Sequence, residues 1–203
     1  MGEHDRGYET ISRAALPVAT VELARYLIGK IVVRETPDAV LSGRIVETEA
    51  YPPGDAAGHA YRGETPRNHA LFLGPGHAYV YLAYGVASML NVSSEPAGVG
   101  AGVLIRALEP TCGIASMQQN RQVETLRDLA RGPGRLAAAL AIDRSLDGGD
   151  LCRRGPLWLA HDGQGDPDIG TSARIGLSRE IDRPLRFYQR GSRFVSGPKA
   201  LNL

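Results

Sequence analysis

Hydrophobic and polar residues follow a helical period in a few stretches of the chain and a strand-like period in several others. Residues 12–29 carry apolar side chains at Val21, Leu23, Ala24, Leu27 and Ile28, a spacing that predicts a lead-in and an amphipathic helix ended by Gly29. Alternating or β-branched runs predict strands over residues 31–34, 43–51, 77–84, 88–94, 103–108, 157–160, 173–177 and 185–190. Residues 111–142 are helical in pieces, interrupted by Gly132-Pro133-Gly134.

Strands outnumber helices in this pattern, and the helices cluster in the middle of the chain. The arrangement predicts an α+β fold with a curved, mostly antiparallel sheet and flanking helices. A chain of 203 residues is long enough to bury one sizeable core, so residues 1–203 are expected to form a single compact domain. Residues 1–10 and 197–203, and more generally the tail after Val195, are expected to be loosely ordered.

Two segments have a composition that suggests function. Residues 52–70 form a long loop rich in glycine, proline and polar residues, and loops of that length in compact domains are usually functional. Tyr79 and Tyr81 share a face of the next predicted strand, and Tyr84 lies beside Gly85 at a turn. Aromatic faces suit stacking on nucleic-acid bases, and a rigid ring at a hairpin tip can wedge between base pairs. Tyrosine also favours strands in general, so ordinary packing remains an alternative.

Composition excludes several classes of protein. Hydrophobic residues make up 43% of the chain and charged residues 22%, which is typical of a soluble globular protein. No run approaches the roughly 20 apolar residues of a membrane span, and residues 1–13 lack the apolar core of a signal peptide. Cys112 and Cys152 are far apart and form no CxxC pair, which favours a reducing compartment. The sequence therefore predicts a cytoplasmic protein, associated with the nucleoid if its source is bacterial, with no membrane partner.

The net charge of +1 does not by itself indicate a nucleic-acid partner, but the distribution of charge does. Residues 1–60 hold nine acids and six bases, whereas residues 174–203 hold seven bases and two acids. Of the 23 basic residues, 21 are arginines, which bind phosphate bidentately. An arginine-rich face that tracks phosphates over residues 174–193 is one interpretation, and a general replacement of surface lysines is the other.

Candidate catalytic groups lie on the predicted strand at residues 43–51. Its alternation puts Ile45, Glu47, Glu49 and Tyr51 on one face, and one of the two carboxylates is a candidate general base. From this strand alone, a solvated face with an arginine partner is the simpler interpretation. The spacing of the histidines matches no common zinc motif, so no metal ion and no cofactor are expected.

Several collinear motifs are more specific together than any one of them. They are Glu47-Thr48-Glu49-Ala50-Tyr51, Gly58-His59, Thr65-Pro66-Arg67-Asn68, Tyr79-Val80-Tyr81 with Tyr84-Gly85, Asn91-Val92, Leu104-Ile105-Arg106-Ala107-Leu108-Glu109-Pro110, Gly132-Pro133-Gly134-Arg135-Leu136, Ala173-Arg174-Ile175-Gly176 and Pro184-Leu185-Arg186-Phe187-Tyr188. In this order they resemble the alkyladenine (3-methyladenine) DNA glycosylase family, in its monofunctional form with an intercalating tyrosine hairpin. The resemblance runs from about residue 10 to about residue 196.

The resemblance implies a base-excision-repair enzyme that hydrolyses the N-glycosidic bond of alkylated or deaminated purines in double-stranded DNA, acting as a monomer. Glu49 matches the glutamate that activates water, and Arg106 and the backbone carbonyl of Ile175 match groups that help to hold this water. Glu47 is then expected to brace the strand or an arginine. Lys30 and Lys199, the two lysines of the chain, lie in no motif, so a Schiff-base lyase step is not expected.

The resemblance also implies how the base and the duplex are held. Tyr51 matches one wall of a base pocket, and His59 and Tyr81 match the other. Asn91 matches the residue that crowds the exocyclic amine of guanine. Tyr84 matches the wedge that enters the minor groove and fills the space left by the flipped nucleotide. The neighbouring residues 87 and 88 are small here, whereas the family often has large side chains beside the hairpin.

Two other functions remain open from the residues alone. A carbohydrate glycosidase could use Glu47 and Glu49 as its carboxylate pair, since alternate residues on a strand lie about 6–7 Å apart. A non-catalytic module that binds distorted duplexes would keep the tyrosines and arginines without needing Glu49. Neither alternative gives a role to all of the motifs.

Overall fold

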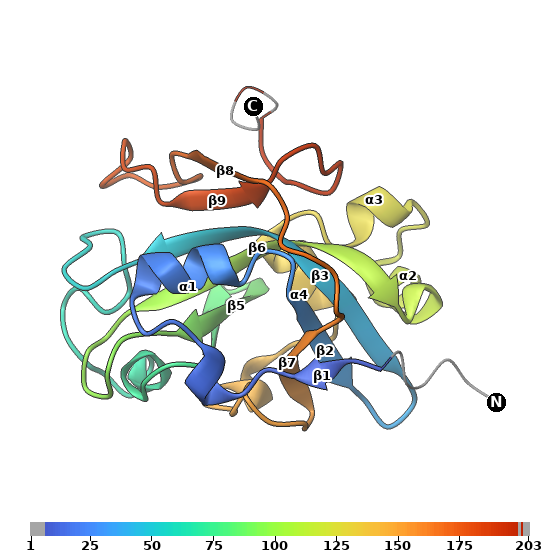
Figure 1. Ribbon diagram of the computed structural model, residues 1–203, viewed down its shortest axis with the longest axis horizontal. Coiled ribbons are helices and arrows are strands. Elements are labelled where there is room, and N and C mark those ends of the chain that lie inside the picture. Colours follow the sequence, from blue (N-terminus) through green and yellow to red (C-terminus); the bar gives the residue numbers. More distant parts are fainter. Residues whose placement is uncertain (1–6, 199, 201–203) are drawn as a thin grey trace.

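The computed structural model describes residues 7–198 and 200, and within them the strands form one curled sheet in which each pair of neighbouring strands is antiparallel (Figure 1). The strands are β1 (Glu9–Thr10), β2 (Ile31–Glu35), β3 (Val40–Tyr51), β4 (Ala78–Ala83), β5 (Ala87–Ser93), β6 (Gly102–Cys112), β7 (Leu157–His161), β8 (Ile169–Ser172) and β9 (Arg186–Gln189). Their order is β1-β7-β2-β3-β6-β5-β4, and β9 pairs with both β3 and β8. The predicted α+β fold with an antiparallel sheet is confirmed.

The long strand β3 organises the sheet. One edge of β3 pairs with β2 up to Arg44 and then with β9 from Glu47 onward, while β6 follows the other edge. The sheet therefore forks along β3. In Figure 1 β8 and β9 lie at the top of the molecule, and β1, β2 and β7 lie below.

Paired β-bulges lie at this fork, and they correct one prediction. Ile45 pairs with Leu108 and Glu47 with Ala107, so Val46 is an extra residue on β3. Ile45 packs in the main hydrophobic core and Val46 in a second cluster, so Ile45 does not share the face of Glu47 as simple alternation predicts.

The helices and 3-10 turns cover parts of the sheet and fill its ends. They are α1 (Thr20–Tyr26), α2 (Ile114–Arg121), α3 (Leu126–Leu129), α4 (Pro133–Ala139) and the 3-10 turns Arg13–Ala15, His69–Phe72 and Arg144–Leu146. The lead-in and helix expected over residues 12–29 correspond to the first 3-10 turn and α1. Helix α1 begins after Pro17, at Thr20, whose backbone N–H donates to the Glu95 carboxylate at 2.8 Å. Among the described helices, none is long and apolar enough to cross a membrane.

Three further expectations are corrected. The strand predicted at residues 173–177 is absent, and the nearby strand β8 ends at Ser172. At Ile175 the backbone N–H donates to the Glu49 side chain and not to a neighbouring strand. Glu9–Thr10, which was expected to be loosely ordered, forms β1 and pairs with β7. Ser196, in the tail that was also expected to be loosely ordered, is buried. The other parts of the tails called loosely ordered, residues 1–6, 199 and 201–203, lie outside the described residues.

Candidate active site

A pocket of about 380 Å³ lies between the β4–β5 hairpin, the loop after β3 and the segment after β8. The candidate residues that line it are Tyr51, His59, Tyr81, Tyr84, Asn91, Arg106 and Ile175. Its size is within the range of small-ligand sites. The structure thus brings these candidates together from segments spread over more than half of the chain.

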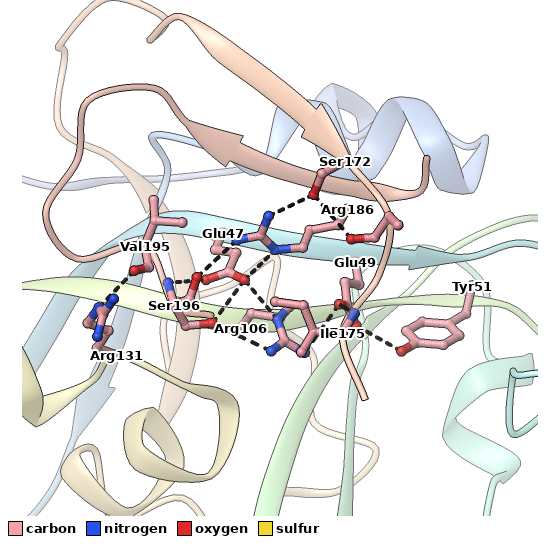
Figure 2. Close-up of polar contacts among 11 residues, drawn as sticks. Glu47, Glu49, Tyr51, Arg106, Arg131, Ser172, Ile175, Arg186, Val195 and Ser196 are labelled. Atoms are coloured by element: carbon pink, nitrogen blue, oxygen red, sulfur yellow. Dashed lines mark hydrogen bonds and ion pairs between the residues drawn. The ribbon is translucent and has the colours of Figure 1, made fainter. Parts of the chain in front are cut away.

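Glu49 has no exposed surface and is not one of the residues that line this pocket, but it contacts residues that do. Its Oε1 accepts a hydrogen bond from the Ile175 backbone N–H at 2.7 Å and lies 3.2 Å from Nη1 of Arg106. Its Oε2 accepts from the Tyr51 hydroxyl at 2.9 Å (Figure 2). Two hydrogen-bond donors and one guanidinium therefore hold the Glu49 carboxylate. The three residues that hold Glu49 all line the pocket.

Glu47, two residues earlier on β3, is also fully buried but has different partners. Its Oε1 accepts from Nε of Arg106 at 2.9 Å and from Nε of Arg186 at 2.7 Å. Its Oε2 accepts from the Ser196 backbone N–H at 2.6 Å (Figure 2). The interpretation of this strand face as solvated is therefore wrong, while the expectation that Glu47 braces an arginine is confirmed.

A second bulge explains how Arg106 reaches both carboxylates. Ala107 pairs with Glu47 and Ile105 with Thr48, so Arg106 is an extra residue on β6 opposite the extra residue on β3. The two bulges cancel, and the register is restored beyond them. Bulges re-aim side chains next to active sites, and here they turn the Arg106 side chain toward the two glutamates.

Burial and mutual charge set the ionisation of this cluster. Burial by itself raises the pKa of Glu47, but the positive charges of Arg106 and Arg186 outweigh it and hold the pKa below its ordinary value. Burial lowers the pKa of Arg106, but the negative charges of Glu49 and Glu47 outweigh it and raise the pKa. Burial and the Glu49 charge raise the pKa of Tyr51, so its hydroxyl stays a hydrogen-bond donor.

Aromatic rings form the upper part of the pocket. The His59 and Tyr81 rings are 4.3 Å apart between centroids, and Tyr79 stacks on Tyr81 at 5.4 Å. The Tyr79 hydroxyl lies 2.9 Å from Nδ1 of His59, a partnership that the sequence did not predict. Burial, and then the nearby charge of Arg67, lower the pKa of His59, which favours the neutral ring. Burial raises the pKa of Tyr79 to about 12.

The loop that carries His59 is held by Asn68, a residue for which the sequence predicted no specific role. Asn68 is buried, and its Nδ2 donates to the backbone oxygens of His59 at 2.9 Å and Gly63 at 3.1 Å. Its Oδ1 accepts from the Thr65 backbone N–H at 2.6 Å. The only sequence signal for this role was its place in the Thr65-Pro66-Arg67-Asn68 motif.

Arg174 is a second structural residue of the pocket. Its side chain is fully buried, with Nη1 2.7 Å from Oδ2 of Asp55 and 2.9 Å from the Ala50 carbonyl oxygen. Its guanidinium lies 4.6 Å from the centre of the Tyr51 ring. Arg174 and the equally buried Arg186 therefore cannot belong to a phosphate-binding face, which corrects that expectation for these two positions.

The remaining candidates lie on the hairpin. Asn91 is buried on β5 and donates from Nδ2 to the Tyr79 carbonyl oxygen at 3.2 Å. Tyr84 is 96% exposed at the tip. Tyr84 and Gly85 both have positive φ, of 50° and 73°, and the Val86 N–H donates to the Ala83 carbonyl oxygen at 3.0 Å. Positive φ at both central residues is the geometry of tight hairpin turns, which here projects the tyrosine ring outward.

The described residues contain no group of three or more histidines, cysteines or acids arranged to hold a metal ion. His59 instead contacts Tyr79, and His69 lies 2.5 Å from the Glu64 carboxylate.

Comparisons with known proteins identify the family of this chain. A family model described as methylpurine-DNA glycosylase matches residues 14–193. A protein of Mesorhizobium japonicum is 69% identical over 191 residues, or 94% of this chain and 92% of that protein. A protein of Paraburkholderia phytofirmans is 51% identical over 201 residues, or 99% and 94%. Both carry the name "Putative 3-methyladenine DNA glycosylase". Because the family model covers most of the chain and the identities are this high, the chain belongs to the methylpurine-DNA glycosylase family.

Proposed function

We propose that this protein excises alkylated or deaminated purines from double-stranded DNA by hydrolysing the N-glycosidic bond with a water that Glu49 activates. Membership in the family supports the general part of this proposal, that the protein is a DNA glycosylase that acts in DNA repair. The observation that supports the activation of water is the placement of Glu49, which is held by Tyr51, Arg106 and Ile175, three residues that line an aromatic pocket. Residues 1–203 then act as one catalytic domain, as a monomer without a cofactor.

The target nucleotide has to leave the duplex before it can react, because a stacked base does not present its sugar bond to a nucleophile. Extrusion costs a few kcal/mol, and less for a damaged or mispaired base. The exposed Tyr84 ring at the hairpin tip would fill the space that the nucleotide leaves.

The extruded purine would stack between Tyr51 on one side and His59 with Tyr81 on the other. An electron-rich ring attracts a cationic alkylated base, and a neutral His59 avoids the repulsion that an imidazolium would cause. Asn91, which is held by the Tyr79 carbonyl, would crowd the exocyclic amine of a normal guanine.

Hydrolysis would take place at the pocket floor. Glu49 accepts a proton from the attacking water and stabilises positive charge on the sugar, as carboxylates do in glycoside hydrolysis. Such a water would replace one of the present contacts of Glu49 and bind Arg106 and the Ile175 backbone. The contact seen at Ile175 is made by its N–H, and the role of its carbonyl stays a prediction. Lys30 does not line the pocket and pairs with Asp166 at 3.1 Å, which supports a monofunctional reaction without a lyase step.

The geometry favours neither of the alternative functions. A carbohydrate glycosidase would need Glu47 as its second carboxylate, yet Glu47 is enclosed by Arg106, Arg186 and Ser196. A non-catalytic DNA-binding module would have no use for a buried carboxylate beneath the pocket.

The decisive variant is Glu49→Gln, assayed by single-turnover release of hypoxanthine and of 7-methylguanine from duplexes with one lesion. Glutamine keeps the shape of the side chain but cannot accept the proton, so the rate should fall by about 10²–10⁴-fold or more. Binding to lesion DNA should stay near that of the unchanged protein.

Glu47→Gln is the matched comparison, because it removes the neighbouring buried carboxylate. Glu47 acts on the reaction only through Arg106, so release per folded molecule should fall by no more than about 10-fold. Near-normal release by Glu49→Gln would exclude Glu49 as the base. A collapse in Glu47→Gln alone would move this role to Glu47.

A further inference from the structure

Ser196 connects the C-terminal segment to the buried charge cluster. Its backbone N–H donates to Oε2 of Glu47 at 2.6 Å, and its hydroxyl donates to Oε1 of Glu47 at 3.0 Å. The same hydroxyl accepts from Nη2 of Arg106 at 3.5 Å, and its carbonyl oxygen accepts from Nη2 of Arg186 at 3.1 Å. Figure 2 shows Ser196 beside Glu47 and Arg106, on the side of the cluster away from Tyr51.

The segment that carries Ser196 is held firmly in place. Phe194 and Val195 are buried in the second hydrophobic cluster, together with Val46 and Tyr188. Nε of Arg131 donates to the Val195 carbonyl oxygen at 2.8 Å. Ser196 itself is buried, so its position is set by the packing of the two residues before it.

The orientation of Arg106 decides how Glu49 is held. The guanidinium directs Nε to Glu47 and Nη1 to Glu49, and Nη2 points to the Ser196 hydroxyl. A planar guanidinium held at three nitrogens has one orientation, because turning it toward one partner withdraws it from the others. Without the hydroxyl, Nη2 loses this acceptor and Glu47 loses one of its donors, so Arg106 is held only by the two carboxylates and its orientation is less restricted.

We propose that Ser196 is a positioning residue for base excision: its hydroxyl fixes Arg106 against Glu47, and Arg106 in turn orients Glu49. The proposal rests on the proposed function, in which Glu49 activates the water. Ser196 lies after residue 193, where the family match ends, and touches neither the pocket nor Glu49 in the contacts described. It therefore acts on the rate of bond cleavage and not on the binding of the base.

The experiment compares Ser196→Ala with Ser42→Ala in the full chain. Ser42 is equally a buried hydroxyl on a hydrogen-bond network, with Thr111 at 2.8 Å, but it lies near the other end of β3. Three quantities are measured: the single-turnover rate of hypoxanthine release, the affinity for the lesion duplex and the melting temperature. Ser196→Ala should slow release about 10-fold with affinity unchanged, since a hydrogen bond in a charged cluster is lost. Ser42→Ala should lower the melting temperature and leave the rate unchanged.

Ser196→Thr keeps the hydroxyl and should stay within about 3-fold of the rate of the unchanged protein. Equal rates in Ser196→Ala and the unchanged protein would overturn the proposal, as would equal slowing in Ser42→Ala, which would indicate a general effect of stability. Failure of the proposed function has a different signature: no base release by the unchanged protein, or full release by Glu49→Gln.

Discussion

At the scale of single residues, the unusual feature is a cluster of four buried charges. Glu47, Glu49, Arg106 and Arg186 are each at most 7% exposed. Burying one unpaired charge costs several kcal/mol, and the cluster persists because two carboxylates face two guanidiniums with hydrogen bonds between them. The burial of Glu49, the proposed general base, thus depends on a balance of charge around it.

This balance predicts how stability depends on pH. Glu47 has a pKa below its ordinary value of 4.5, so its contribution to stability is complete above that value and is lost as pH falls through the lowered pKa. Glu47→Gln should lower the free energy of unfolding at pH 7 by about 3–5 kcal/mol, as expected when one partner of a buried pair is removed. Below pH 4.5 the difference from the unchanged protein should shrink. Urea unfolding at a series of pH values measures both effects.

Glu22→Gln is the control for this measurement, because Glu22 is an exposed glutamate on α1. It should change the stability little at any pH. A constant difference between Glu47→Gln and the unchanged protein down to the lowest pH would show that Glu47 does not titrate as its arginine partners imply.

At the scale of elements, the β4–β5 hairpin carries two groups of candidate site residues. Its stem carries Tyr79, Tyr81 and Asn91 on the pocket, and its tip exposes Tyr84 and the 83% exposed Val86. A non-glycine residue with positive φ is strained, and Tyr84 holds this conformation in the turn. Because stem and tip belong to one rigid hairpin, a ring inserted into DNA would have a defined position relative to the pocket.

The hairpin predicts a defect in flipping when the ring is removed. Tyr84→Ala should weaken binding to a lesion duplex and reduce the flipped population, because nothing then fills the space of the extruded nucleotide. Tyr84→Phe keeps the ring and should behave like the unchanged protein. A fluorescent base analogue next to the lesion reports the flipped population. Equal flipping in Tyr84→Ala and the unchanged protein would rule out the wedge.

At the scale of the whole molecule, the arginines at residues 174–193, in the C-terminal third, differ in exposure, and Arg183 is half-buried beside Asp55. Arg174 and Arg186 are buried and hold the pocket and the charge cluster, whereas Arg179, Arg190 and Arg193 are exposed. An exposed guanidinium can neutralise a phosphate, and Arg179 follows the residues 175–177 that line the pocket. The basic character of this third therefore serves both the fold and, as we expect, the DNA.

Salt dependence of binding tests this division. Arg179→Gln should reduce the slope of log affinity against log salt by about one, and by the same amount on every duplex, if Arg179 contacts one phosphate. Arg153→Gln is the control, because Arg153 is exposed but lies away from the hairpin tip. It is close to Asp150, which forms a β-bridge with His77, the residue before β4. An unchanged slope in Arg179→Gln would place this arginine away from the DNA.

Local patterns predicted much of the fold, and the family resemblance supplied the candidate site residues. The strands at residues 31–34, 77–84 and 103–108 and the turn at Tyr84 follow from β-propensity and the break at Gly85, which act over a few neighbouring residues. The collinear motifs named the residues that line the pocket, because a motif preserves residue types at fixed spacings. Their chemical roles stay predictions until the variants are measured.

Tertiary structure decided the features that depend on pairing between distant segments. Alternation along β3 placed Ile45 with Glu47, but pairing with β6 introduces bulges that separate them and aim Arg106 at the carboxylates. The partners of these carboxylates at Ile175 and Ser196 lie 126 and 149 positions away along the chain, respectively. A periodic pattern describes only which way a side chain points from its own strand. Which charge meets it across the fold depends on packing that no local pattern contains.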